Sequence, residues 1–379
     1  MNTSPIIQGW CPGALRPMLS GDGLVVRIRP RAGRLTADQA RGVAALASLH
    51  GNGLIDLSNR ANLQVRGVTE ASHPALIKGL TALDLIDEDA GAEARRNIIV
   101  SPFWGQEDPT QALALELAKA LSAPNAPQLP NKFGFALDTA AAPCLRDIAA
   151  DIWIETGPDG MLLASHADLG KPVTPATAVT EAMALAQWFV DTGGMEGGRG
   201  RMATLLQRTP LPADFTAKRH PAAPRPGPGQ TAQGQLVAFE FGQMQAETLA
   251  SLADLGPMRV TPWRMLLIET LADAPRIAGV ITDAADPMLW VIACTGAPGC
   301  LQAYAATRPL ARALAPHLTQ TLHVSGCAKG CAHPAVAPLT LTATPTGFRL
   351  IRGGTASDPS LRDGLSATDL TETLLTGAP

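Results

Sequence analysis

Short runs of alternating hydrophobic and polar residues surround one stretch with helical spacing near the start of the chain. The segment 24–28 alternates as a β-strand does, and 37–49 carries its apolar residues at the spacing of a helix. Thr36 is a suitable N-cap for that helix, with Gln39 as its capping-box partner. A second strand is expected over 54–57. The pattern therefore predicts a small α+β unit.

The stretch that follows, Ser-Asn-Arg-Ala-Asn-Leu-Gln-Val-Arg, again has a period of two. Its apolar residues, Leu63 and Val65, alternate with three polar ones: Asn62, Gln64 and Arg66. A strand with this period places its apolar pair in a core and its polar set on the opposite face. We therefore expect a face of hydrogen-bonding and cationic side chains beside the core.

The same order of elements returns in the second half of the chain. The predicted elements there are a strand, a helix and two strands, over 236–241, 245–255, 258–261 and 265–268. The tetrapeptide Leu-Ala-Ser-Leu occurs at 46–49 and again at 249–252, at the same place in each helix. We infer an internal duplication.

A longer unit follows each small one. The apolar run 97–104 resembles 289–295, and 129–137 stands where 322–331 stands in the second half. Pro and Gly recur between 210 and 234, so we expect a linker without regular structure there. The predicted class is α+β, with two copies of a small α+β unit followed by a larger α/β unit.

Composition and charge narrow the possible partners. Of 379 residues, 46% are hydrophobic and 17% charged, and the net charge is −3. This balance does not support a nucleic-acid partner or an anionic membrane surface. Neither a signal peptide nor a long apolar run is visible. We therefore expect a cytoplasmic protein of two or more domains that works without a membrane.

Four of the six cysteines form the strongest chemical signal. Cys294 and Cys300 are spaced C-x5-C, and Cys327 and Cys331 are spaced C-x3-C, with Gly and Pro around each sulfur. Each pair follows an apolar strand, and two turns at strand ends can aim four sulfurs at one point. Four convergent thiolates with nearby backbone N–H groups are what an iron–sulfur cluster needs. A helix over 301–314 would add its positive end to this site.

Other uses of these cysteines remain open. A structural zinc site more often has shorter spacing, buried inert thiols would not cluster beside so many glycines, and disulfides are disfavoured in the cytoplasm. Cys11, in Gly-Trp-Cys-Pro-Gly, and Cys144 lack this context. We expect both to be structural thiols.

Together the motifs resemble the nitrite and sulfite reductase family. The cysteine spacing is similar to that family's cluster signature, and 58–67 resembles its tetrapyrrole- and substrate-contacting strand. Arg-Arg-Asn at 95–97 and Leu-Pro-Asn-Lys-Phe at 129–133 resemble two further active-site segments. The likeness extends from about residue 9 to 351 and includes the twofold repeat.

The resemblance implies ferredoxin-like half-domains and reductase-type α/β domains in a pseudo-twofold repeat. The implied boundaries are 9–80 and 235–285 for the half-domains, 90–208 and 286–355 for the α/β domains, 209–234 for the linker and 356–379 for a C-terminal segment. The second α/β domain would bind the cluster.

Departures from the reductase pattern indicate one branch of this superfamily. Lys132 is retained, but Gly134 stands where reductases have a second lysine, and Ala-Lys at 328–329 replaces Pro-Asn in the cluster turn. With Trp-Cys-Pro-Gly at 10–13 and Thr-Pro-Trp-Arg at 261–264, the chain resembles the precorrin-3B synthase family. That resemblance implies a monooxygenase of cobalamin biosynthesis, which hydroxylates precorrin-3A at C20 with O₂ and forms a γ-lactone.

The same resemblance implies the site and its cofactors. Matching positions suggest Arg60, Arg96 and Lys132 as catalytic residues. They suggest as substrate-binding residues Asn62, Gln64, Arg66 and Arg264, since a polycarboxylate tetrapyrrole needs cationic, bidentate partners. The implied cofactors are a 4Fe–4S cluster on Cys294, Cys300, Cys327 and Cys331, a mononuclear non-haem iron, and NADH as the electron source.

Several points stay open. Non-haem iron commonly takes two His and one carboxylate, but no spacing among the seven His forms such a set, so its ligands are unassigned. No Rossmann fingerprint is visible, so NADH is expected to act through a reductase or ferredoxin. We expect a monomer. The alternatives are a sirohaem-dependent nitrite or sulfite reductase, and a non-catalytic iron–sulfur or tetrapyrrole-binding protein.

Overall fold

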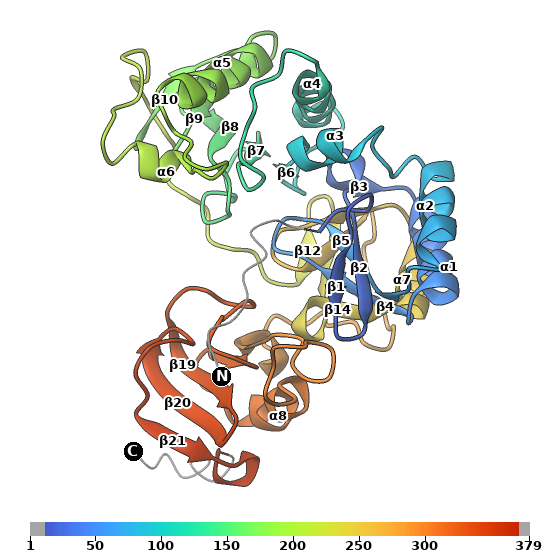
Figure 1. Ribbon diagram of the computed structural model, residues 1–379. Helices are drawn as coiled ribbons and strands as arrows, with labels where there is room; N and C mark the ends of the chain where they lie inside the picture. The colour runs from blue at the N-terminus through green and yellow to red at the C-terminus, as the bar shows by residue number, and fades with distance from the viewer. Residues whose placement is uncertain (1–11, 371–379) are drawn as a thin grey trace.

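The computed structural model describes residues 12–370, and in this part of the chain the strands form four β-sheets. Figure 1 shows three lobes, one with both half-domains and their helices, one above it in green, and one below it in red. Cys11 and the neighbouring Trp10 lie outside the described residues. No helix within 12–370 is both long and apolar enough to cross a membrane.

Two five-stranded sheets build the lobe with the half-domains, and each sheet borrows a strand from the other half of the chain. The first has the order β1 (Met18–Ser20), β2 (Gly23–Ile28), β5 (Leu63–Val68), β4 (Leu54–Leu57) and β14 (Gln243–Gln245). The other has the order β12 (Gly229–Thr231), β13 (Gly234–Ala238), β16 (Met265–Glu269), β15 (Met258–Val260) and β3 (Arg34–Leu35). The exchange of β3 and β14 joins the two halves into one unit.

Three helices accompany these sheets: α1 (Ala37–His50), α2 (His73–Ala82) and α7 (Ala246–Ala253). The predicted capping box of α1 is confirmed, because the Thr36 side chain accepts from the Gln39 N–H while the Gln39 side chain accepts from the Thr36 N–H. Leu63 and Val65 are fully buried in the shared core, as their alternation predicts. α1 packs on α7, its counterpart in the second half.

The duplication extends to unusual backbone conformations. The short 3₁₀ turns η1 (Arg31–Gly33) and η2 (Glu240–Gly242) contain Ala32 and Phe241 at φ of 51° and 58°. The turns before β5 and β16 contain Ala61 and Arg264 at φ of 52° and 61°. A left-handed conformation at non-glycine residues is uncommon, so its recurrence at matching places supports a common origin of the two halves.

The green lobe is a six-stranded mixed sheet with helices. Its strands, in spatial order, are β11 (Ala217–Lys218), β10 (Leu169–Pro172), β9 (Gly160–Ala164), β8 (Ile152–Gly157), β7 (Phe135–Asp138) and β6 (Ile98–Val100). Its helices are α3 (Ala90–Arg95), α4 (Thr110–Ser122), α5 (Ala178–Asp191) and α6 (Met202–Leu205). β6, β7 and β8 run parallel, and the next strands are antiparallel.

The red lobe repeats this order of parallel and antiparallel strands. Its sheet is β17 (Val291–Ala293), β18 (Leu322–Ser325), β19 (Ala337–Thr344), β20 (Gly347–Gly354) and β21 (Arg362–Leu365). It also contains η3 (Pro287–Trp290), α8 (Arg308–Leu314) and η4 (Ala315–His317). The first three strands are parallel and the last two antiparallel, as in β6 to β10.

The strand pairing corrects one predicted correspondence. Phe135 of β7 pairs with Ile152, and Leu322 of β18 pairs with Leu339, so β7 is the counterpart of β18. The counterpart of the turn 326–331 is therefore 139–144, rather than the segment 129–137. Counted from these strands, Cys144 occupies the place of Cys331.

Three details of the local structure differ from the predictions. The linker 209–234 contains β11 and β12, because short edge strands pair with β10 and β13 in spite of the prolines. β21 pairs with β20, so the last sheet continues beyond residue 355. The expected helix 301–314 begins only at Arg308. Backbone groups of Tyr304 and Ala305 bond instead to Gly326 and Ala297, which holds the chain after Cys300 out of a helix.

Candidate functional site

The two cysteine turns lie at one edge of the sheet in the red lobe. β17 and β18 are adjacent and parallel, so their carboxyl ends meet at the same edge. Cys294 directly follows β17, and Cys327 comes two residues after β18. The Tyr304 N–H donates to the Gly326 carbonyl at 2.9 Å, which ties the chain after Cys300 to the second turn.

The four thiols lie within electrostatic reach of one another. Burial raises the pKa of Cys327 and of Cys331, and the charges of the other cysteines raise both further, while Lys329 lowers them. The Gly326 N–H donates to the Cys294 Sγ at 3.1 Å. Cys294, Cys300 and Cys327 are partly buried and Cys331 is exposed, so four thiols on two adjacent turns stand near one another with a backbone N–H directed at one sulfur, as a cluster requires. The donor set therefore fits a 4Fe–4S cluster.

Glycine is required where the two turns approach their neighbours. A Cβ on Gly326 would lie 2.7 Å from the Ala303 Cβ and 3.5 Å from the Cys294 Sγ. A Cβ on Gly296, whose φ is 67°, would lie 2.6 Å from the Thr307 Oγ1. Side chains at these positions would separate the turns, so both glycines help to bring the sulfurs together.

A mononuclear iron finds no comparable donor set. Within residues 12–370, no three His, Cys, Asp or Glu side chains are placed to hold one metal ion. His323 is fully buried on β18, and neither of its ring nitrogens has a hydrogen-bond partner there. Burial lowers its pKa to about 4, and the His333 ring lies 5.6 Å away between centroids. Two imidazoles do not make a triad of two His and one carboxylate, so the described residues do not fit a mononuclear iron.

Arg66 connects the first half-domain to the first cysteine turn. Its guanidinium bonds to Asp22 at 2.6 and 3.0 Å and lies 3.6 Å from Asp56. The same group donates to the Gly299 carbonyl at 3.4 Å, beside Cys300. The Ser20 hydroxyl also donates to that carbonyl, at 2.7 Å. Arg66 is thus placed to position the first cysteine turn, and its charge is paired with the carboxylates of Asp22 and Asp56.

A second group of arginines surrounds Asp56. Arg308 lies 3.9 Å from the Asp56 carboxylate, and Gln243 donates to it at 2.6 Å. Burial lowers the pKa of Arg308 and of Arg264, while the Asp56 charge opposes both shifts. The charge of Cys294 also acts on Arg308. The structure therefore places the predicted Arg264 in a cationic region next to the cluster turns.

The other predicted residues fall into two places. Arg96 is buried and pairs with Asp87 at 2.8 and 2.9 Å, and it also donates to the Arg29 carbonyl. The Arg60 Nη2 donates to the carbonyl of Lys132 at 3.2 Å, which brings these two predicted residues together. The Lys132 side chain is exposed.

The polar face of β5 is more enclosed than its pattern suggests. Asn62 and Arg66 are buried, and Gln64 pairs across the sheet with Arg27. Sequence reasoning missed Asp22, Asp56 and Arg308, which complete the charge network around Arg66. Asp22 and Arg308 are far from Arg66 in the chain, and Asp56 comes near it only through the pairing of β4 with β5.

Comparisons with known proteins support the fold. Residues 16–83 match the family of nitrite/sulfite reductase ferredoxin-like half domains. The structure of the NirA protein of Mycobacterium tuberculosis superposes with a TM-score of 0.64, at 19% identity, over 93% of this chain and 79% of that one. The chain therefore has the nitrite/sulfite reductase fold.

Curated relatives identify the family to which the chain belongs. A sulfite reductase (ferredoxin) of Mycobacterium tuberculosis is 24% identical, with 83% of this chain and 69% of the relative covered. A chloroplastic ferredoxin–nitrite reductase of Zea mays is also 24% identical, with 83% and 68% covered. A precorrin-3B synthase of Sinorhizobium sp. is 31% identical, with 92% of this chain and 84% of the relative covered. The chain belongs to the precorrin-3B synthase family.

Proposed function

We propose that the protein is an O₂-dependent monooxygenase that converts precorrin-3A to precorrin-3B in cobalamin biosynthesis. One atom of O₂ enters the product as a hydroxyl at C20, and a ring-A acetate closes as a γ-lactone. The other oxygen atom leaves as water, with two electrons from NADH that arrive through a reductase or ferredoxin. The observation that supports this proposal most is the pair of cysteine turns joined by Arg66 to a half-domain rich in arginine.

The arginine-rich region suits the substrate. Precorrin-3A is a polycarboxylate, and guanidinium groups bind carboxylates with two parallel hydrogen bonds. Arg60, next to the exposed Lys132, and Arg264, beside the cysteine turns, are the proposed contacts. Gln64, on the same strand as Arg66, and Asn62, directly before that strand, are proposed to orient the macrocycle. Arg66 and Arg96, which are held in ion pairs, are proposed to position the binding segments.

The 4Fe–4S cluster, when bound, would supply single electrons beside this region. The chain's own contribution is to hold the cluster between two turns and to direct the Gly326 N–H at the sulfur of Cys294. The mononuclear iron remains part of the proposed cofactor set through the family resemblance alone.

Gly134 favours this reaction over sirohaem-dependent reduction. A Cβ at Gly134 would lie 3.0 Å from the Asn97 Nδ2 and 3.3 Å from the Ala149 carbonyl oxygen. The second lysine of the reductase pattern would therefore have to displace Asn97, which donates to the Phe133 carbonyl at 2.8 Å. The segment is built around a glycine, so one cationic group of the reductase pattern is absent.

An absorption spectrum of protein purified without oxygen tests this choice. A broad shoulder in the region of a bare iron–sulfur cluster is expected, and incubation with precorrin-3A, a reductant and O₂ should give a product with one more oxygen atom. Intense Soret and red bands from co-purified sirohaem, together with sulfite or nitrite reduction and no change in precorrin-3A, would contradict the proposal.

A further inference from the structure

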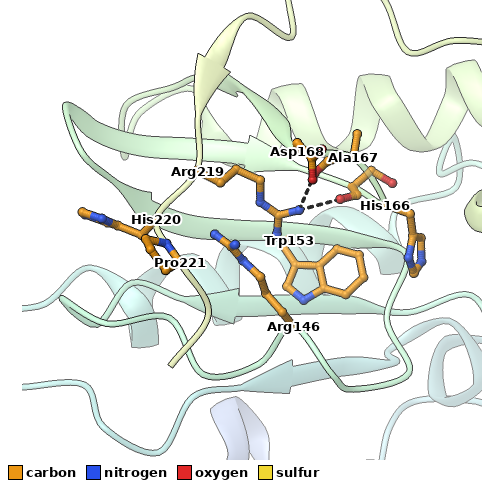
Figure 2. A pocket seen from close by; sticks show the side chains of 9 residues that line it. Arg146, Trp153, His166, Ala167, Asp168, Arg219, His220 and Pro221 are labelled. Atoms are coloured by element: carbon orange, nitrogen blue, oxygen red, sulfur yellow. Dashed lines mark hydrogen bonds between the residues drawn. The ribbon is translucent and has the colours of Figure 1, made fainter. Parts of the chain in front are cut away.

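A polar pocket in the green lobe is not used by the site described above. Its volume is about 500 Å³, and it lies where β8 begins and β9 ends, closed by the chain after β11. Figure 2 shows the guanidinium groups of Arg146 and Arg219 side by side, between Trp153 on one side and His220 on the other. His166 stands beyond Trp153. We call this the Arg146 pocket.

The two arginines share one buried carboxylate. Arg219 bonds to both oxygens of Glu155 at 2.7 Å, and Arg146 bonds to them at 2.7 and 3.3 Å. Burial alone would raise the pKa of Glu155, but the hydrogen bonds and charges of Arg219 and Arg146 outweigh it and lower the pKa. Glu155 is therefore ionised, and its one negative charge is shared by two guanidinium groups at the pocket floor.

One arginine is left with donors for a ligand. Arg219 also donates to the carbonyls of Ser165 and Ala167, at 2.7 and 2.9 Å, so it is well occupied. Arg146 uses Nε and Nη2 for Glu155, and its Nη1 has no hydrogen bond to a described residue. Asp168 stands at the exposed rim, where water screens its charge. The floor of the pocket thus favours an anionic group.

The wall of the pocket is hydrogen-bonded to the segment that carries Lys132. The Gly134 N–H donates to the Asp151 carboxylate at 3.0 Å, and the Asp151 N–H donates to the Gly134 carbonyl at 2.7 Å. The next residue back, Ala150, bonds through its carbonyl to the His166 ring at 3.1 Å. The pocket wall and the contact between Arg60 and Lys132 are therefore parts of one hydrogen-bonded segment.

We infer that the Arg146 pocket binds carboxylate arms of the tetrapyrrole substrate, with Arg146 as the direct partner and His220 at its side. This inference rests on the proposed function for the identity of the macrocycle. The pocket holds only part of such a molecule, so the macrocycle and its other carboxylates lie outside it. A ligand with more carboxylate arms offers Arg146 more partners and should bind more tightly than one with half as many.

Fluorescence quenching of two porphyrins provides the assay. The octacarboxylate uroporphyrin III and the tetracarboxylate coproporphyrin III are titrated with full-length protein, and citrate and phosphate are added as competitors. Arg146→Ala keeps the bidentate pair of Glu155 with Arg219, so the fold should hold. His220→Asp adds a negative charge without breaking any ion pair, and His220→Gln is its neutral control. Arg208→Ala removes an exposed arginine outside the pocket.

The expected result is a rise of about ten- to a hundred-fold in the Kd for uroporphyrin with Arg146→Ala and with His220→Asp. Arg208→Ala and His220→Gln should stay near wild type. If wild type binds uroporphyrin and both Arg146→Ala and His220→Asp bind it equally well, the inference is overturned. The inference is also overturned if Arg146→Ala weakens the binding of citrate or phosphate and leaves porphyrin binding unchanged. If wild type binds neither porphyrin nor precorrin-3A, the proposed function itself fails.

Discussion

Replacing Arg66 should break the link between the first half-domain and the first cysteine turn. The Arg66 side chain is 7% exposed, and its carboxylate partners Asp22 and Asp56 are 21% and 14% exposed. Arg66→Ala leaves both carboxylates without this partner in a poorly hydrated place. Breaking a buried pair costs about 3–5 kcal/mol, and partial exposure of Asp22 lowers the expected loss to roughly 2–4 kcal/mol. That is a large share of the typical free energy of unfolding, about 5–15 kcal/mol.

The same change releases Gly299, next to Cys300. We expect Arg66→Ala to lower the urea midpoint of tryptophan fluorescence and to reduce iron and acid-labile sulfide per chain. Arg66→Lys should recover part of both, because one ammonium group can meet Asp22 without the fork geometry. Asp22→Asn should weaken the same link more mildly.

The duplication supplies a matched control. Arg259 pairs with Glu269 at 2.7 Å and donates to the carbonyls of Pro102 and Trp104, in the turn after β6 that corresponds to the first cysteine turn. Arg259→Ala should destabilise the protein by a similar amount but leave iron and sulfide intact, since no cysteine pair lies in that turn. If Arg66→Ala keeps full stability and full iron, or if both variants lose iron equally, the reasoning is refuted.

Three further predictions test separate parts of the account. Arg60→Ala should weaken tetrapyrrole binding, measured by fluorescence quenching, with iron and sulfide unchanged; loss of the cluster would make Arg60 structural. Cys331→Ser should abolish the cluster absorbance, whereas Cys144→Ser, at the corresponding place in the first half, should not. Burial raises the pKa of Asp138 to about 6, above its ordinary 3.8. The protonated form thus contributes about 3 kcal/mol to the free energy of unfolding below pH 4, and this contribution is lost as the pH rises through 6. Asp138→Asn should therefore reduce the change of the urea midpoint between pH 4 and 7. An unchanged pH dependence would contradict the shift.

Local patterns were sufficient for the main elements of the fold. The period-two strands, the helix after Thr36 and the repeated order of elements depend on neighbouring residues, so the sequence alone predicts them. The cysteine pairs were recognisable for the same reason, since each follows its own strand. The edge strands β11 and β12 were missed because pairing partners outside the segment, rather than its Pro-rich composition, determine them.

Contacts between distant segments could not be predicted in the same way. Asp22 and Gly299 are 44 and 233 residues from Arg66 in the chain. A polar residue on a period-two face is compatible with either a substrate contact or a buried ion pair, and only the fold shows the ion pair. The same holds for Arg96, whose partner Asp87 is nine residues away and follows no strand or helix period.

The most direct test of the central claim is the fate of oxygen from ¹⁸O₂. Purified protein is incubated with precorrin-3A, a reductant and ¹⁸O₂, and the product is analysed by mass spectrometry, with a parallel reaction in H₂¹⁸O. The account predicts one ¹⁸O atom in each product molecule from ¹⁸O₂ and none from labelled water. A product that forms without label from ¹⁸O₂, or no product at all from protein with a full complement of iron and sulfide, would contradict it.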